Sequence, residues 1–341
     1  MKYIYPLSII SALAFPVTLM AAKVTLPNLS DSSKVHDIEE VTVVSQPKEV
    51  FRLRQQPLSS TSVSHAELTA LGLRDLRELS NFIPSFTMPE YGSRLTSSVY
   101  VRGIGSRVNS PAVGIYVDDM PILNKSAFNF HFYDIDRVDV LRGPQGVLYG
   151  QNTEGGVIRI YSKNPFNYQG TDMHFGWGSH FWRNVEATTY QKINDKFAFS
   201  FGGFYDGQNG FFKNITTGQR ADQFNEAGGR FRLMYRPTNR LTYDFITDYQ
   251  YVRQNGFPYG ILNVETNETS SPSTNLQSNY RRNILNTGLN IIFKANAFDF
   301  TSASSYQYLK DYMLMDQDYL PVDYMKLEQR QFQNAFAQYF S

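Results

Sequence analysis

Several segments in the second half of the chain alternate between apolar and polar residues, and this pattern constrains the fold more than any other feature. From Leu241 to Tyr251, mostly aromatic and aliphatic residues occupy one parity, whereas aspartate, threonine and glutamine dominate the other. Successive side chains of a β-strand point to opposite faces, so each such strand has one apolar and one polar face. The same register recurs at 226–235, 285–293 and 298–308. The region after Pro165 is therefore predicted to form long antiparallel strands.

The connections between these strands are alternately short and long. Tight turns are expected near 194–195, 237–239 and 294–296, and long connections near 207–222, 254–280 and 310–327. A soluble sandwich with one wet face would explain the alternation of residues, but it gives no reason for alternating connector lengths. Outer-membrane barrels have short periplasmic turns and long external loops. The pattern therefore favours transmembrane β-barrel strands.

Composition agrees with this class and excludes others. Aromatic residues make up 15% of the 341 residues, with 23 Tyr and 26 Phe, which suits the aromatic girdles of a membrane barrel. The 32 Lys+Arg nearly balance 31 Asp+Glu, which leaves no basic surface for nucleic acid. The absence of cysteine excludes a disulfide scaffold, a zinc–thiolate site and a thiol nucleophile.

The first 22 residues are expected to be a secretory signal peptide. One lysine precedes a largely apolar run, which ends at Ala21-Ala22. A membrane anchor is the alternative, but Pro6 and Pro16 interrupt a run that is barely long enough to span a bilayer. Export without a long apolar helix leads to the periplasm, the outer membrane or the exterior.

Residues 23–49 are expected to form a flexible tail that contains one short strand. Four strand-forming residues at 41–44 follow two carboxylates and are stopped by Pro47. Such a strand has no partner nearby and can add to the edge of another protein's sheet. The tail is too short for a folded signalling domain, which disfavours a transducer role.

Residues 50–165 are predicted to form a compact α+β domain, and about 115 residues is an ordinary domain size. Ser64 and Glu67 form a capping box that begins a helix, and Gly72 is placed to end it. Leu73, Leu76 and Leu79 predict a second helix with one apolar stripe. Strands are expected at about 98–102, 113–118, 136–141 and 157–162.

Four blocks in this domain combine strand residues with glycine turns, at 98–105, 111–121, 136–150 and 155–160. Arg102-Gly103 and Arg142-Gly143 each end a strand with the residue that tolerates positive φ. Pro144 then presets a turn. In this order the blocks resemble the plug signature of TonB-dependent outer-membrane receptors. The matching residues are Arg102, Gly103, Asp118, Asp119, Arg142, Gly143, Gly146, Tyr149, Gly150, Gly155 and Gly156.

The resemblance implies an active transporter in the outer membrane of a Gram-negative bacterium, neither an enzyme nor dependent on a cofactor. Its cargo would be a scarce nutrient, most often a ferric siderophore or another metal chelate. Its partners would be outer-membrane lipid and TonB with the inner-membrane energising complex. The tail strand then corresponds to the TonB box, formed by Glu40, Val41, Thr42, Val43, Val44 and Ser45. In the family, plug arginines such as Arg102 and Arg142 pair with carboxylates of the barrel wall.

Substrate candidates follow from position in the family, on outward plug loops and external barrel loops. The cationic and aromatic residues there suit an anionic iron chelate with planar groups. They are Tyr91, Arg94, Arg107, Phe212, Lys213 and Tyr259, although polar, mobile loops explain each residue equally well.

Other chemistry finds no support in the sequence. Asp118 and Asp119 are adjacent on a strand and point to opposite faces, so a structural role is expected rather than a metal pair. The five histidines never occur at the close spacing of a metal site, so no metal ligands are predicted. No nucleophile elbow or paired acid motif supports an exported hydrolase.

Counting from Thr171 gives about eight strands, whereas enclosing a plug takes roughly 22. A domain of about 115 residues has a radius of gyration near 13 Å, too large for an eight-stranded lumen. The sequence is therefore expected to be the N-terminal part of a receptor with an incomplete barrel over 166–341. Its last segment, 331–341, has a spacing of phenylalanines that also suits a helix. The alternative function is a truncated, non-transporting remnant that acts at most as a binding protein.

Overall fold

The computed structural model describes residues 59–107 and 110–341. The N-terminal domain, here called the plug (residues 59–165), is an α+β domain built on a five-stranded sheet of order β1-β7-β8-β5-β6, in which only the β5–β8 pair is parallel. A second, small sheet has the order β2-β3-β4, and its strands lie between β1 and β5 in the sequence. The strands are β1 Ser59–Ser64, β2 Phe86–Thr87, β3 Tyr100–Val101, β4 Ile104–Gly105, β5 Val113–Val117, β6 Met120–Pro121, β7 Ile135–Arg142 and β8 Gly156–Ser162.

The plug helices begin where side chains can cap them. Helix α1 (His65–Ala70) has the predicted capping box, in which Ser64 Oγ accepts from the Glu67 amide and Glu67 accepts from the Ser64 amide. Gly72 has the positive φ of 65° expected of a helix-ending glycine. The second helix is shorter than predicted. Asp75 accepts from the Glu78 amide and so starts α2 (Leu76–Ser80), with Leu73 left outside.

Three shorter helical turns complete the plug: η2 (Arg94–Thr96), η3 (Lys125–Ala127) and α3 (Gly146–Tyr149). The interior of the plug is apolar, because leucines from the helical region pack on the β-branched residues of the central strands. Side chains with no exposed surface include Leu76, Leu79, Val138, Val140, Ile158 and Ile160. Burial of such side chains contributes about 1.5–3 kcal/mol each. Ile284 and Leu309 of the strands that follow join the same apolar cluster.

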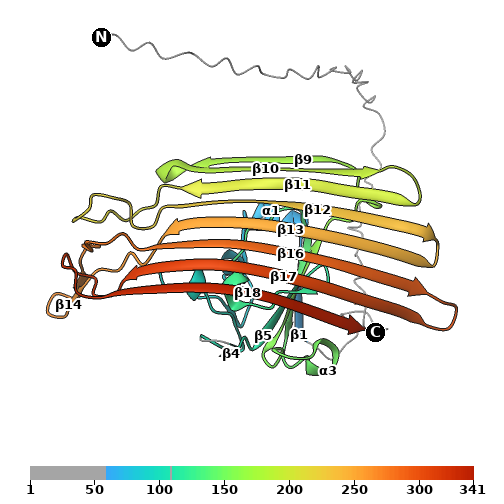
Figure 1. Ribbon diagram of the computed structural model, residues 1–341, viewed down its shortest axis with the longest axis horizontal. Helices are drawn as coiled ribbons and strands as arrows, with labels where there is room; N and C mark the ends of the chain where they lie inside the picture. Colours follow the sequence, from blue (N-terminus) through green and yellow to red (C-terminus); the bar gives the residue numbers. More distant parts are fainter. Residues whose placement is uncertain (1–58, 108–109) are drawn as a thin grey trace, which may run out of the picture. The chain divides into compact units, whose positions relative to one another are not determined.

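Eight long strands follow the plug and form one antiparallel sheet, here called the wall (Figure 1). Its order is β18-β17-β16-β13-β12-β11-β10-β9, so the sheet is open and the predicted count of eight is confirmed. The last segment pairs with β17 as a strand, which excludes the helical alternative. The strands are β9 Gly170–Gly178, β10 Trp182–Lys192, β11 Phe197–Gln208, β12 Phe224–Thr238, β13 Leu241–Asn255, β16 Asn279–Lys294, β17 Asp299–Asp316 and β18 Lys326–Phe340.

The two faces of the wall differ as the alternation predicted. In β13, Asp244, Asp248 and Gln250 are buried on the face that meets the plug, whereas Tyr249 on the other face is 46% exposed. Large apolar residues elsewhere on the wall are also exposed, among them Phe175, Trp177, Phe201, Phe300 and Tyr306. The wall is therefore polar towards the plug and apolar on its outer face.

Connections at the two ends of the wall differ in length (Figure 1). The long loops 209–223, 256–278 and 317–325 lie at one end, and the middle one carries the small hairpin β14 (Leu262–Asn263) and β15 (Glu268–Thr269). The short turns 193–196, 239–240 and 295–298 lie at the other. A helical turn, η4 (Ser179–Phe181), joins β9 to β10 at the long-loop end. The boundary expected at 165/166 falls between β8 and β9.

Candidate functional site

Three wall arginines are buried where the wall meets the plug. Arg230 and Arg232 lie on β12 and Arg282 lies on β16, and their exposed fractions are 3%, 8% and 0%. A buried guanidinium is stable only with charged or hydrogen-bonding partners, so these three side chains define where the two parts are fastened.

Arg232 fastens β12 to the end of the central plug sheet. Its Nε and Nη2 donate to the two carboxylate oxygens of Asp244 at 2.9 and 2.7 Å, and Nη1 donates to Ser162 Oγ at 2.9 Å. Asp118 lies 3.7 Å from Nη1 and accepts from the Ser162 amide and hydroxyl at 2.8 Å each. One arginine thus joins the β5–β6 turn and the end of β8 to the wall.

Arg230 lies between carboxylates of both parts. Asp248 of the wall is 3.5 Å from its Nε, and Asp134 of the plug is 3.8 Å from its Nη1. Tyr133 donates to Asp248 at 2.7 Å, and Tyr190 donates to Asp134. Burial raises the pKa of the Asp134 carboxyl to about 6, although the Arg230 charge opposes that rise.

Arg282 recognises the plug through backbone atoms. It donates to the carbonyl oxygens of Ser126 and Asn129 at 2.5 and 2.8 Å. Asn290 donates to the Asp118 carbonyl oxygen at 3.2 Å on the same strand. The η3 turn of the plug is therefore held by donors of Arg282 on β16, and the Ser126 side chain also bonds the Asp311 carboxylate of β17.

In one further ion pair the arginine lies on the plug and the carboxylate lies on the wall. Arg94 of η2 donates both Nη atoms to Glu226 of β12 at 2.6 and 2.7 Å, and the Arg94 side chain is only 11% exposed. A bidentate, buried pair of this kind is geometrically specific. This ion pair occupies the Arg94 guanidinium, which the sequence predicted to bind substrate.

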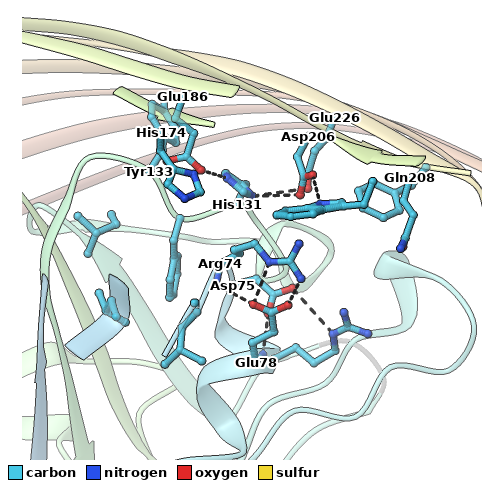
Figure 2. A pocket seen from close by; sticks show the side chains of 18 of the residues that line it. Arg74, Asp75, Glu78, His131, Tyr133, His174, Glu186, Asp206, Gln208 and Glu226 are labelled. Atoms are coloured by element: carbon cyan, nitrogen blue, oxygen red, sulfur yellow. Dashed lines mark hydrogen bonds and ion pairs between the residues drawn. The ribbon is translucent and has the colours of Figure 1, made fainter. Parts of the chain in front are cut away.

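A histidine of the plug lies beside that pair (Figure 2). His131 Nε2 is 2.8 Å from Glu186 Oε1, and its Nδ1 faces Asp206 at 3.7 Å and Glu226 at 3.8 Å. Its ring stacks on Phe204 with centroids 4.4 Å apart. Burial lowers the pKa of His131, but the hydrogen bond to Glu186 and the neighbouring carboxylate charges outweigh it, so the pKa is raised.

A cavity of about 1190 Å³ opens beside His131. Carboxylates outnumber lysines and arginines on its lining, and Figure 2 shows the Arg74, Asp75 and Glu78 group on the plug side of the space. Burial raises the pKa of Asp75, against the nearby charge of Arg77. The acidic residues are Asp75, Glu78, Glu90, Asp134, Asp172, Glu186, Asp206, Asp222 and Glu226, and the cations are Arg74, Arg77, Arg94 and Lys163. The cavity favours cations.

The structure brings part of the predicted substrate site together. Tyr259 donates to the Tyr91 carbonyl oxygen at 2.8 Å, and the exposed Arg107 guanidinium lies 4.4 Å from the Tyr91 ring centre. Phe212 and Lys213 are exposed on the neighbouring loop 209–223. That loop is linked to 256–278, because Asn214 donates to Thr274 and the Ile215 amide donates to the Pro272 carbonyl oxygen. Arg94 is held apart from this group by Glu226.

Residues of the plug motif occupy turns and strand ends. Gly103 and Gly143 have φ of 78° and 118°, as predicted for glycines that end strands. Asp118 and Asp119 lie in a turn with φ of 49° and 67°, so the strand predicted to reach 118 ends one residue earlier. Asp119 accepts from Arg159 at 2.8 Å. Both carboxylates therefore have structural partners.

The remaining motif residues lie close by in the plug. The Tyr149 ring contacts the Tyr116 ring in a tilted arrangement, with centroids 5.3 Å apart, and the Tyr116 hydroxyl donates to the Tyr149 carbonyl oxygen at 2.9 Å. Gly146 opens α3 and Gly150 follows it with φ of 75°. The Gly155 amide bonds the Ala112 carbonyl oxygen at 2.8 Å, and Gly156 begins β8.

Among the described residues, 59–107 and 110–341, neither Arg102 nor Arg142 contacts a carboxylate of the wall. Arg142 pairs with Ser59 across β7 and β1, and its guanidinium donates at 3.0 Å to Thr61 and to the Pro84 carbonyl oxygen. Arg102 lies beside Gly143. Their position within the plug sheets directs both towards plug atoms. The expected TonB box at 40–45 and the signal peptide at 1–22 lie outside the described residues.

Sequence reasoning missed the groups that join the two parts. His131 follows no metal or catalytic motif, and Glu186, Asp206 and Glu226 lie on three different strands. Polar residues at the inward parity of β10, β11 and β12 were the available signal. The parity of these residues indicates which face of the wall they lie on, but it does not identify the plug residue that each of them contacts.

Among the residues that the structure describes, no helix is long and apolar enough to span a membrane. Residues 52–157 match the family described as TonB-dependent Receptor Plug Domain. The pesticin receptor of Yersinia pestis is 33% identical over 143 residues, which are 41% of this chain and 21% of that receptor.

Two solved structures share the fold of the plug and wall. The ferric yersiniabactin uptake receptor of Yersinia pestis matches with a TM-score of 0.73 at 23% identity, over 82% of this chain and 44% of its own. The ferripyoverdine receptor of the outer membrane of Pseudomonas aeruginosa matches with a TM-score of 0.68 at 15% identity. The match covers 84% of this chain and 40% of that receptor. The chain thus spans less than half the length of these relatives.

The plug match and the polar-inside wall around it define a plugged, barrel-type receptor fold. The plug domain belongs to the TonB-dependent receptor plug family, and the matching receptors support a TonB-dependent receptor. Proteins of this family are receptors and transporters rather than enzymes, in agreement with the prediction from sequence.

Proposed function

We propose that the protein is an outer-membrane receptor that imports a ferric siderophore with energy from TonB. The observation that carries the proposal is the fastening of a plug to the polar inner face of strands whose outer face is apolar. A sheet with exposed Phe201, Tyr249 and Phe300 on one side suits contact with lipid. Buried Arg230 and Arg232 on the other side suit a plug that occupies the lumen.

The substrate class follows from the long-loop end. Tyr91, Arg107 and Tyr259 present two rings and an exposed guanidinium, which suit an anionic chelate with planar groups. Phe212 and Lys213 extend the same character on the linked loop. Two relatives are named for ferric yersiniabactin and ferripyoverdine, which supports a ferric siderophore as cargo. Arg94 has no place in this site, because Glu226 holds it.

The proposal includes the division of the chain. Residues 1–22 direct export, 23–49 form a tail with the TonB box at 40–45, 50–165 form the plug and 166–341 contribute barrel strands. The tail strand would pair with the sheet edge of TonB's periplasmic domain, through backbone hydrogen bonds.

Uptake of radiolabelled ferric siderophore by a receptor-deleted strain carrying the full-length gene tests the proposal. Val43→Pro removes an amide donor and fixes φ within the proposed TonB box, so uptake should fall to the level of a TonB-deleted strain. Val35→Pro, in the same tail but outside the box, should leave uptake unchanged. Surface abundance is measured for each variant. Normal uptake by a correctly delivered Val43→Pro protein would contradict TonB coupling through this strand.

A further inference from the structure

The plug–wall interface contains a group of nitrogen and oxygen ligands that the proposed function does not use. His131 Nδ1 and carboxylate oxygens of Asp206 and Glu226 all lie within 4.8 Å of one another, and all three residues are buried. We propose that these three side chains bind a divalent first-row transition-metal ion that fastens the plug to the wall. This ion is separate from the iron of any transported chelate.

The spacing of the ligands suits a shared ion. His131 Nδ1 is 3.7 Å from Asp206 Oδ2 and 3.8 Å from Glu226 Oε1, so neither contact is a hydrogen bond. Two ligands bonded to one ion at about 2.1 Å, with a tetrahedral to trigonal angle, lie roughly 3.4–3.6 Å apart. Shifts of a few tenths of an ångström would bring His131 Nδ1 to that distance from each carboxylate oxygen, and all three atoms already lie within 4.8 Å of one another. A proton on Nδ1 would supply charge but could not hydrogen-bond at these distances.

The strand register independently calls for a cation. Asp206 and Glu226 are direct cross-strand partners on β11 and β12, with both side chains on the plug face. Like charges directly opposite each other destabilise a sheet unless a cation lies between them. Glu186 adds a third carboxylate beside His131, whereas Arg94 brings a single positive charge. Arg74 and Arg282 act on Asp206 and Glu226 from farther away, and a divalent cation would add positive charge directly between these two carboxylates.

Each ligand is oriented by a second group, as metal ligands usually are. Glu186 contacts His131 Nε2 at 2.8 Å, which leaves Nδ1 directed at the carboxylates. Trp182 Nε1 donates to Asp206 Oδ1 at 2.7 Å, so Oδ2 remains available. Arg94 donates one hydrogen bond to Glu226 Oε1, and a carboxylate oxygen has a further lone pair for a metal.

The ligand set selects the type of metal. One imidazole nitrogen and two carboxylates suit Zn²⁺, Co²⁺ or Mn²⁺, whereas Ca²⁺ and Mg²⁺ prefer an all-oxygen shell. All three ligands line the cavity of about 1190 Å³, which gives an ion a route of entry and room for water ligands. The bound ion would join the plug segment between η3 and β7, which contains His131, to β11 and β12 of the wall.

Metal binding to the receptor purified in detergent tests this proposal without any measurement of transport. After removal of metals with a chelator, the protein is titrated with Zn²⁺, Co²⁺ and Ca²⁺ separately. We expect one Zn²⁺ or Co²⁺ per chain, visible absorption bands for bound Co²⁺, and no Ca²⁺ at the same concentrations. Zn²⁺ should also raise the unfolding temperature of the wild-type protein.

Variants identify the ligands. His131→Asn and Asp206→Asn should each weaken Zn²⁺ binding at least tenfold and abolish the Zn²⁺-dependent rise in unfolding temperature. His174→Asn is the matched control, because His174 lines the same cavity but bonds Asn184 at 2.9 Å. Circular dichroism and heat-modified gel mobility show whether each variant is folded, and either ligand variant suffices if the other misfolds.

Two results would overturn the proposal. One is a wild-type protein that binds no Zn²⁺ or Co²⁺ at micromolar concentration, which would leave His131 as a protonated partner of the carboxylates. The other is binding that survives in His131→Asn and Asp206→Asn, or that is lost equally in His174→Asn. Because the readout is metal content, failure of siderophore uptake has no bearing on it.

Discussion

The plug interior and the plug–wall interface are both buried, but they are built from opposite chemistry. Inside the plug, Leu79 and Ile158 have no exposed surface and contact other apolar side chains. At the interface, charged groups such as Arg230, Arg232 and Arg282 are buried as well, beside a few apolar wall residues such as Ile284 and Leu309. Most of the apolar cluster belongs to the plug, whereas the buried charges lie between the plug and the wall.

The energetics of the two regions differ accordingly. Apolar burial stabilises the plug mainly through its own side chains, with Ile284 and Leu309 of the wall at the edge of the same cluster. A buried ion pair gains Coulomb energy but loses hydration of both ions, so its net contribution is small even where its geometry is specific. The interface thus determines how the plug is oriented more than how stably it is folded.

The largest expected effect tests the ionic side of this comparison. Arg232→Met leaves Asp244 and Asp118 without their cation, which should destabilise the interface by about 4 kcal/mol. Hydrogen exchange of amides near Ser162 should accelerate accordingly. Arg253→Met, at an exposed position of β13, is the matched control and should show little change. Adding Asp244→Leu should recover part of the loss, and no recovery would contradict the view that the pair contributes little net stability.

Leu79→Ala tests the apolar side. Removing a fully buried leucine from α2 should destabilise the plug by about 3 kcal/mol through lost burial and a residual cavity. Urea dependence of hydrogen exchange in β7 and β8 measures this loss. Leu71→Ala, at an exposed position just after α1, should have little effect. Equal effects of the two substitutions would mean that the plug lacks an independent core.

Acidity should tighten one part of the interface. The pKa of Asp134 is about 6 in the folded protein against an ordinary value of 3.8, so the folded state holds the proton more strongly. This contribution is fully present below about pH 4 and is lost as the pH rises to about 6, a change of about 2–3 kcal/mol. Protection factors of amides near β7, corrected for the intrinsic pH dependence of exchange, should therefore be larger at pH 4 than at pH 7. Asp134→Asn should flatten that dependence, and an unchanged profile would contradict the assignment.

The smallest effect is expected where an ion pair is half exposed. Arg77 lies 3.3 Å from Glu90 at the cavity, with 48% of its side chain exposed. Solvent screens such a pair, so Arg77→Gln should cost less than about 1 kcal/mol. A loss comparable to that of Arg232→Met, in the same exchange measurement, would show that burial does not decide the strength of these contacts.

Features that depend on neighbours in the sequence could be predicted well. The capping box of Ser64 and Glu67, the alternating faces of 241–251 and the short and long connections all follow from local residue types. The second helix is shorter than predicted because the Asp75 side chain caps it and it begins at Leu76. The spacing of the leucines predicts an apolar face but does not reveal where the helix is capped. The plug motif located the turns at Gly103 and Gly143 for the same local reason.

The local pattern of residues predicts the plug domain and strands with one polar and one apolar face, since parity and turn chemistry are local properties. Which charges meet depends on how the chain folds in three dimensions. Arg94 and Glu226 are 132 positions apart, and Asp206 opposes Glu226 only through the register of β11 and β12. Pairing across a sheet or a docked interface depends on register and orientation, which no single segment encodes.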